Sequence, residues 1–234
     1  MLTHIAVVNH SRRSDIDIAF EVEAVARQLR EHVAPLWDGE PPGMAFYGTA
    51  EHVPADKAAV LGYVNDDGNA DSAGYHTAAG SFIYGLIDVN QSRVPSVTLS
   101  HEGAEMYGNP RLDRKVRGKN GRFYYVELND PVQEQTYEIE VTVFGQTRQV
   151  RVADFVLPAW FGLPNPPAAG TRTTYLGQPL APFEIARGGY QIAESPEGEI
   201  IFLASTLGAS LRRSKHSRTM RIVDKMISHT LAQT

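Results

Sequence analysis

The sequence of 234 residues contains no cysteine. This absence excludes disulfide bonds, thiolate catalysis and cysteine-ligated zinc, so any metal ion must be held by His, Asp or Glu. It is compatible with a reducing cytoplasm, and also with the many extracellular bacterial and viral proteins that lack cysteine. The search for a metal site therefore reduces to eight histidines and their acidic neighbours.

Long apolar runs are also missing, and none approaches the ~20 residues that a membrane-spanning helix needs. The first residues place an apolar run before the basic ones, which is the reverse of the order in a signal peptide. We expect a soluble protein without a signal peptide or membrane partner, either cytoplasmic or virion-associated. No Walker loop, dinucleotide fingerprint or G-x-S-x-G elbow is present.

The chain has no excess of positive charge. Its formal net charge is -5, so nothing global favours nucleic acid or an anionic membrane as the partner. The exception is the basic run at residues 211–221, LRRSKHSRTMR. This run could be a patch that binds nucleic acid, a phosphorylated partner or an assembly surface. The favoured interpretation is that it is the solvated start of a last helix.

The N-terminal half alternates patterns typical of strands and helices. Residues 3–10 form an apolar run rich in β-branched side chains, which predicts a buried strand. Residues 14–37 carry apolar side chains at helical spacing, with Ser14 as a plausible N-cap and Pro35 as the end of the helix. Further strands are predicted at residues 43–48, 58–64 and 81–89, and a Gly/Asn/Asp-rich loop at 65–74.

The C-terminal half contains short strand-like segments separated by Gly, Asn and Pro. These segments are RFYYVEL, TYEIEVTVF, TRQVRVADFVL, GYQIAE and EIIFLAS. Residues 162–182 are rich in Pro and Gly and predict a surface loop or wrapping arm, and residues 219–234 predict a last helix. We expect an α+β fold with a mixed sheet and a central helix. Its core spans residues 1–161, and the arm, a β-hairpin and the last helix at 162–234 pack on that core.

The segment SVTLSHEGAEMYGNP, residues 96–110, contains the pattern H-E-x-x-E. Pro95 suits the first turn of a helix, and Gly108 suits its C′ position, so a helix is predicted over residues 93–107. On that helix His101 and Glu105 are four residues apart and share one face, where both can bind one ion. Glu102 points about a quarter-turn away and can serve as a general base. The alternative is a solvated helix with an incidental His-Glu pair.

A metal site needs a third ligand, and three acidic residues downstream are candidates. Asp113 follows the turn after the helix, while Glu127 and Asp130 lie at the end of a predicted strand. Glu127 is the preferred ligand, and Asp130 is expected to contact a ligand rather than the ion itself. The competing interpretation of Glu127 is an ordinary outward-facing carboxylate on a strand.

Three motifs together resemble a known family. The segments TLSHEGAEMYGNP, VELNDPVQ and VADFVLPAWF resemble the pattern S-H-E-x-x-E-M-x-x-D-P, E-x-x-D-P and F-V-x-P-x-[WY]-F of zincin-like metallopeptidases from bacteria and bacteriophages. AGYHTAAG, residues 73–80, resembles a G-Y-H segment that these proteins carry upstream. The H-E-x-x-E and E-x-x-D pair is more distantly similar to plant secreted proteins of the exordium type. The resemblance covers roughly residues 1 to 161.

The resemblance implies a zincin-like fold with a metal site on its central helix. It implies His101 and Glu105 as metal ligands, Glu102 as the general base and Glu127 as the third ligand. This chain departs from the pattern at Asn109, where the family has Asp. Any negative charge that the family places at that position is therefore missing here.

The predicted ligands suggest zinc first, and Mn²⁺ or Ca²⁺ as alternatives. Two carboxylates place more negative charge on the ion than a histidine-rich site does, which weakens its pull on water and favours harder cations. Candidates for a second donor to the developing oxyanion are Tyr75, His76, Tyr124 and Tyr125. The leading hypothesis is a metallopeptidase or related hydrolase acting on peptides or proteins. The alternative is a non-catalytic structural or assembly protein, such as part of a phage particle, that keeps the scaffold.

Overall fold

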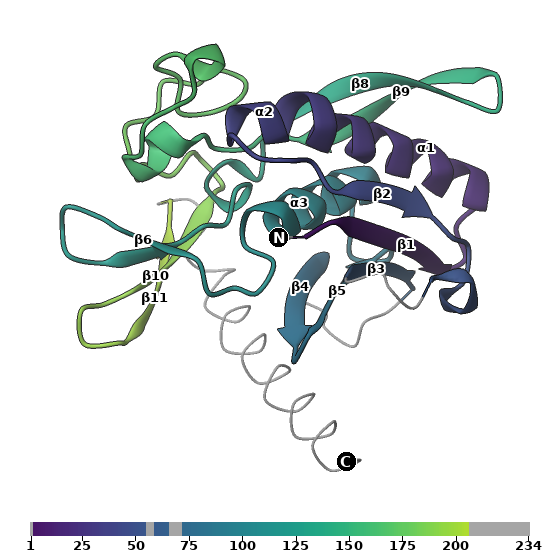
Figure 1. Ribbon diagram of the computed structural model, residues 1–234, viewed down its shortest axis with the longest axis horizontal. Coiled ribbons are helices and arrows are strands. Elements are labelled where there is room, and N and C mark those ends of the chain that lie inside the picture. Colours follow the sequence, from purple (N-terminus) through teal and green to yellow (C-terminus); the bar gives the residue numbers. More distant parts are fainter. Residues whose placement is uncertain (1, 55–58, 66–71, 206–234) are drawn as a thin grey trace, which may run out of the picture.

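The main sheet has five strands in the order β2-β1-β3-β5-β4. We describe the chain from a computed structural model, in which residues 2–54, 59–65 and 72–205 are described (Figure 1). Four strands are parallel, and β4 at the edge is antiparallel to β5. Their bounds are β1 (His4–His10), β2 (Gly43–Phe46), β3 (Ala59–Val64), β4 (Gly74–Ala79) and β5 (Phe82–Asp88).

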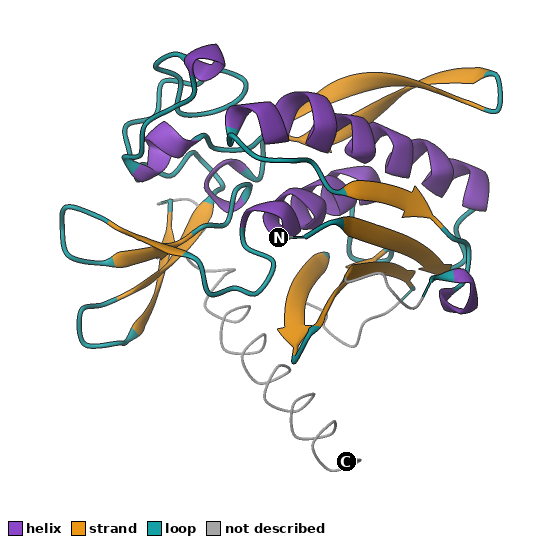
Figure 2. Cartoon of the chain, in the orientation of Figure 1, coloured by secondary structure: helices purple, strands orange, loops and turns teal. Residues whose placement is uncertain are grey.

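A second, antiparallel sheet has the order β11-β10-β7-β6, and β8 and β9 form a separate hairpin. The bounds of these strands are β6 (Lys115–Arg117), β7 (Phe123–Tyr125), β8 (Thr136–Val143), β9 (Gln146–Ala153), β10 (Tyr190–Glu194) and β11 (Ile200–Ala204). The α-helices are α1 (Asp15–Arg27), α2 (Ala34–Leu36) and α3 (Pro95–Gly108), and a π-helical turn (Gln28–Val33) joins the first two. Short 3-10 turns lie at Ala50–His52, Asp130–Val132, Pro158–Phe161 and Pro167–Ala169. The chain is thus a mixed α+β protein (Figure 2).

The helices α1 and α3 are sandwiched between the main sheet and the β8–β9 hairpin (Figure 1). The strand register places Leu61 and Tyr63 of β3 on the same sheet face as Ile87 of β5. These side chains are fully buried, as are Leu99 and Met106 of α3. Burial of one such side chain contributes about 1.5 to 3 kcal/mol, so this layer fixes the position of α3.

α3 lies close to its neighbours because small residues occupy its contact positions. A Cβ atom on Gly103 would lie 3.3 Å from Val25 of α1, and one on Gly108 would lie 2.9 Å from Leu128. Gly108 is the last residue of the helix, and Asn109 is its C-cap. The prediction of Gly108 as a C′ residue was therefore wrong by two positions, and the glycine is needed for the close approach of Leu128.

Most of the predicted elements are present. The helix around the H-E-x-x-E motif and the predicted strands correspond to α3, β1, β2, β3, β5 and β7 to β11. Pro35 does not end the first helix, because the chain passes through the π-helical turn and continues to Leu36. Ser14 is the N-cap but forms no side-chain capping bond. β4 and β6 were not predicted, and the basic run and last helix lie outside the described residues.

The Pro/Gly-rich segment after β9 forms no strand or α-helix between residues 162 and 182. It is nevertheless attached to the rest of the chain at its end. The ring of Phe183 lies 4.3 Å from that of Tyr124 and 5.6 Å from that of Trp160, between ring centroids. The indole of Trp160 donates a hydrogen bond to the carbonyl of Glu184 at 2.7 Å. These contacts hold the segment beside the second sheet.

Asp154, directly after β9, generates a prediction about stability and pH. It is fully buried, and its Oδ1 accepts hydrogen bonds from the amides of Phe155 and Leu176. Burial raises the pKa of Asp154 from 3.8 to about 6, outweighing those two bonds. Ionisation of this carboxyl therefore destabilises the fold by roughly 3 kcal/mol, a cost absent below pH 3.8 and complete above pH 6.

Asp154→Asn should consequently gain stability relative to the parent chain as the pH rises through that window. Denaturant unfolding at about pH 4 and about pH 7.5 measures the two differences, and the other titrating groups cancel between the two proteins. Equal differences at the two pH values would contradict the assignment.

Candidate metal centre

A cavity of about 470 Å³ lies between α3, the edge strand β4 and the second sheet. Histidines and carboxylates from several separate segments line it, together with a few tyrosines and aliphatic side chains. The ionisable lining residues other than tyrosine are His76, His101, Glu102, Glu105, Glu127 and Asp130. No Lys or Arg is among the described residues that line this cavity. Carboxylates therefore outnumber basic side chains in this cavity.

The first cluster consists of His101, Glu105 and Asp130. The imidazole Nε2 of His101 is 3.1 Å from Glu105 Oε1 and 3.1 Å from Asp130 Oδ1. Ligand atoms bound ~2.1 Å from a tetrahedral ion are ~3.4 Å apart, so the observed spacing fits a metal ion with little rearrangement. Helical spacing aligns the first two residues, and a 3-10 turn at Asp130–Val132 brings in the third.

The second cluster consists of His76, Glu102 and Glu105. Nδ1 of His76 is 3.2 Å from Glu102 Oε2 and 3.9 Å from Glu105 Oε2. β4 can approach α3 this closely because residue 74 is glycine, where a Cβ atom would lie 2.5 Å from Thr98. In each cluster the three ligand atoms lie within 4.8 Å of one another.

Glu127 belongs to neither cluster, although it lines the same cavity. Its Oε1 accepts a hydrogen bond of 2.9 Å from the side-chain amide of Asn109, which is fully buried. The Oδ1 of Asn109 accepts from the Arg114 amide at 2.8 Å. Thus the structure groups Asp130 with His101 and Glu105, and it places Glu127 beside Asn109.

Burial and mutual repulsion control the charges in the cavity. Glu102, Glu105, Glu127 and Asp130 are each at most 5% exposed. Burial, and then the charge of Asp130, raises the pKa of Glu105 to about 8. Burial, followed by the charge of Glu105, raises the pKa of Glu127 well above its usual value. A metal ion would relieve this repulsion.

The carboxylates of the cavity also affect the pKa of His101, the histidine of the first cluster. Burial alone would lower the pKa of His101, but the carboxylates of Glu105 and Asp130 raise it well above its ordinary value. A positive charge is thus stabilised at this position.

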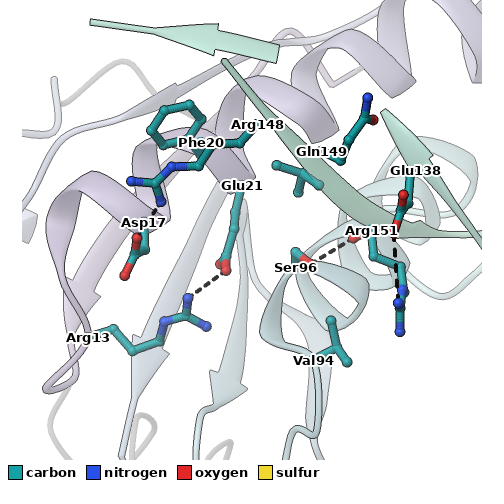
Figure 3. A pocket seen from close by; sticks show the side chains of 11 residues that line it. Arg13, Asp17, Phe20, Glu21, Val94, Ser96, Glu138, Arg148, Gln149 and Arg151 are labelled. Carbon is teal, nitrogen blue, oxygen red and sulfur yellow. Dashed lines mark hydrogen bonds and ion pairs between the residues drawn. The ribbon is translucent and has the colours of Figure 1, made fainter. Parts of the chain in front are cut away.

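A second cavity, of about 440 Å³, lies between α1, the start of α3 and β9 (Figure 3). Its charged side chains pair with one another: Arg13 with Glu21 at 2.6 Å and Arg148 with Asp17 at 2.7 Å. Arg151 lies 3.8 Å from Glu138. Basic and acidic side chains are thus equal in number in this cavity, whereas carboxylates outnumber basic side chains in the first.

Of the predicted auxiliary residues, Tyr75, His76 and Tyr125 line the cavity and Tyr124 does not. Tyr75 and His76 are consecutive in β4, so their side chains leave the strand on opposite faces. Tyr124 packs on an aromatic ring and accepts a hydrogen bond from Asn120 at 2.9 Å.

Two further candidates lie at the border of the cavity or away from it. Tyr125 lines the cavity, but its hydroxyl donates to Glu194 at 3.3 Å. Asp113 is exposed and does not line the cavity.

Tyr190 of β10 is a lining residue that the sequence reasoning missed. Its hydroxyl hydrogen bonds to Asp130, and burial and the charge of Asp130 raise its pKa well above the usual value. The only signal in the sequence is the strand alternation that places Tyr190 and Ile192 on one face, and both line the cavity.

No family model, curated protein or solved structure matches the chain. Within residues 2–54, 59–65 and 72–205, no helix has the length and apolar character needed to cross a membrane. Any functional conclusion therefore depends on the residues of the cavity themselves.

The contact between Asn109 and Glu127 generates a second prediction. Asn109→Asp replaces a buried donor with a carboxylate that repels Glu127, and should lower the unfolding free energy of the metal-free protein by roughly 1 to 3 kcal/mol. Urea unfolding in the presence of a chelator measures the change. Asn90→Asp, at an exposed loop position, is the matched control and should be nearly neutral. Equal stability of the two variants would show that Asn109 does not support Glu127.

Proposed function

We propose that this chain is a divalent-metal-dependent hydrolase of the zincin-like type that cleaves peptide or related amide bonds. The observation that carries the proposal is the first cluster, in which His101, Glu105 and Asp130 converge in a cavity with Glu102 beside them. Glu102 is 5% exposed, and its Oε2 lies 3.2 Å from His76 Nδ1, so this carboxylate is held beside the cluster where a general base is needed.

In this proposal His101, Glu105 and Asp130 hold the ion. When bound, a divalent ion supplies Lewis acidity, which lowers the pKa of water and polarises a carbonyl group. Three protein ligands leave a coordination position open, as in catalytic zinc sites. Two carboxylates in the set make Mn²⁺ or Ca²⁺ acceptable as well as Zn²⁺, because harder cations prefer oxygen ligands.

Glu102 is the proposed general base. On α3 it follows His101 by one residue, so its carboxylate reaches the cavity from an adjoining direction. It accepts a proton from the attacking water and passes it to the leaving amine. His76 Nδ1 lies 3.2 Å from Glu102 Oε2 and limits the rotamers of this carboxylate.

Tyr190 has a supporting role in the proposal. Its hydrogen bond to Asp130 orients a proposed ligand, and such outer contacts normally affect metal affinity.

The edge strand β4 suits the binding of an extended peptide. Among the described strands it pairs with β5 alone, and it carries His76 into the cavity, so a peptide added to its other edge would pass beside the proposed ion. A peptide or protein substrate is therefore favoured over a small polar molecule. Figure 1 shows β4 at the end of the main sheet nearest the second sheet.

Paired substitutions on α3 test the assignment. Glu105→Gln should abolish tight binding of the ion, measured as metal content after dialysis against trace Zn²⁺ or Mn²⁺. Glu102→Gln should retain one bound ion but lose roughly 10²- to 10⁴-fold in cleavage of a peptide library. Glu23→Gln, on the exposed side of α1, is the control and should change neither quantity.

Unchanged metal content in Glu105→Gln would contradict the ligand assignment. Equal cleavage by the parent chain and Glu102→Gln, or no cleavage with Zn²⁺, Mn²⁺ or Ca²⁺, would contradict catalysis and leave a binding or assembly role for the site.

A further inference from the structure

Glu105 is common to both clusters, and its two oxygens face different histidines. Oε1 lies 3.1 Å from His101 Nε2, while Oε2 lies 3.9 Å from His76 Nδ1. A carboxylate with one oxygen directed to each of two sets of ligands has the geometry of a bridge between two cations.

The cavity also holds more carboxylates than one ion at the first cluster would engage. Four buried carboxylates line it, and no basic side chain other than histidine lines it among the described residues. An ion at the first cluster would engage Glu105 and Asp130 and leave Glu102 without a cation. A second ion beside His76 would use the carboxylate of Glu102 together with the second oxygen of Glu105.

His76 has the outer contact typical of a metal-ligating histidine. Its Nε2 lies 3.3 Å from the backbone carbonyl of Asn109, which can only accept a hydrogen bond, so Nε2 carries the proton that it donates. Nδ1 then faces Glu102 and Glu105, and a cation bound between them would replace any proton that Nδ1 shares with Glu102. Ligating histidines usually donate their other N–H to a carbonyl or carboxylate in this way.

We infer that the cavity takes a second divalent cation at His76, Glu102 and Glu105, with Glu105 bridging the two ions. This inference rests on the proposed function for the first ion. Because the second ion takes the carboxylate of Glu102, that residue no longer accepts a proton, and the second ion lowers turnover. Excess metal is then an inhibitor that acts through a defined site.

Binding of Mn²⁺ to the metal-free chain tests the second site without any assay of activity. Native mass spectrometry should find two ions on the parent chain, one on His76→Ala and none on Glu105→Gln at the same free Mn²⁺. His52→Ala, at an exposed histidine, is the control and should retain two. Two Mn²⁺ ions sharing a carboxylate are magnetically coupled, so the electron paramagnetic resonance spectrum of the parent chain alone tests the bridge even if a variant fails to fold.

The inference is overturned if the parent chain binds one ion at saturation, or if two ions give the spectrum of isolated Mn²⁺. In peptide cleavage, excess Mn²⁺ should inhibit the parent chain and not His76→Ala, with each activity normalised to its own value at one ion. Two coupled ions without any cleavage would contradict the proposed hydrolase and leave the two-ion site in place. Cleavage by a parent chain that binds only one ion would contradict the second site and leave the proposed hydrolase in place.

Discussion

The concentration of four buried carboxylates in one cavity is the constraint on which the site depends. Glu102, Glu105, Glu127 and Asp130 repel one another, and desolvation adds to that cost. Two histidines and the amide of Asn109 offset only part of it. Such an arrangement is expensive for a fold that needs only stability, because buried carboxylates in mutual contact can be replaced by apolar side chains at little loss. The proposed binding of divalent cations would offset this cost.

The fold assembles this cavity by holding α3 between the main sheet and the β8–β9 hairpin, while the second sheet lines another side of the cavity. α3 presents His101, Glu102 and Glu105 from a rigid element whose apolar residues are locked between the main sheet and the β8–β9 hairpin. Glycines at 74 and 108 let β4 and the chain near Leu128 come close enough to add their own side chains. His76 from β4 and Asp130 from the turn after β7 thus join the residues of α3 in one cavity.

The sequence alone predicts the parts of the site that depend on local periodicity. Helical spacing is sufficient to place His101 and Glu105 on one face, and the proline and glycine around them mark the helix. The choice between Glu127 and Asp130 depends on a 3-10 turn after β7, which local patterns do not specify. β4 was hidden because GYHTAA lacks the alternation of a strand, and Tyr190 enters from a segment that is distant in sequence. Strand pairing and long-range packing determine those contacts.

X-ray absorption at the zinc edge, with less than one equivalent of zinc per chain, tests most directly whether the first cluster binds a metal. The account predicts a shell of nitrogen and oxygen at ~2.0 to 2.1 Å with the outer scattering of one imidazole. That imidazole signal should persist in His76→Ala and vanish when His101→Ala is added to that variant, because the histidines of both clusters are then absent. A spectrum of fully hydrated zinc, or one that is the same in His76→Ala and in the double variant, would contradict binding at the first cluster.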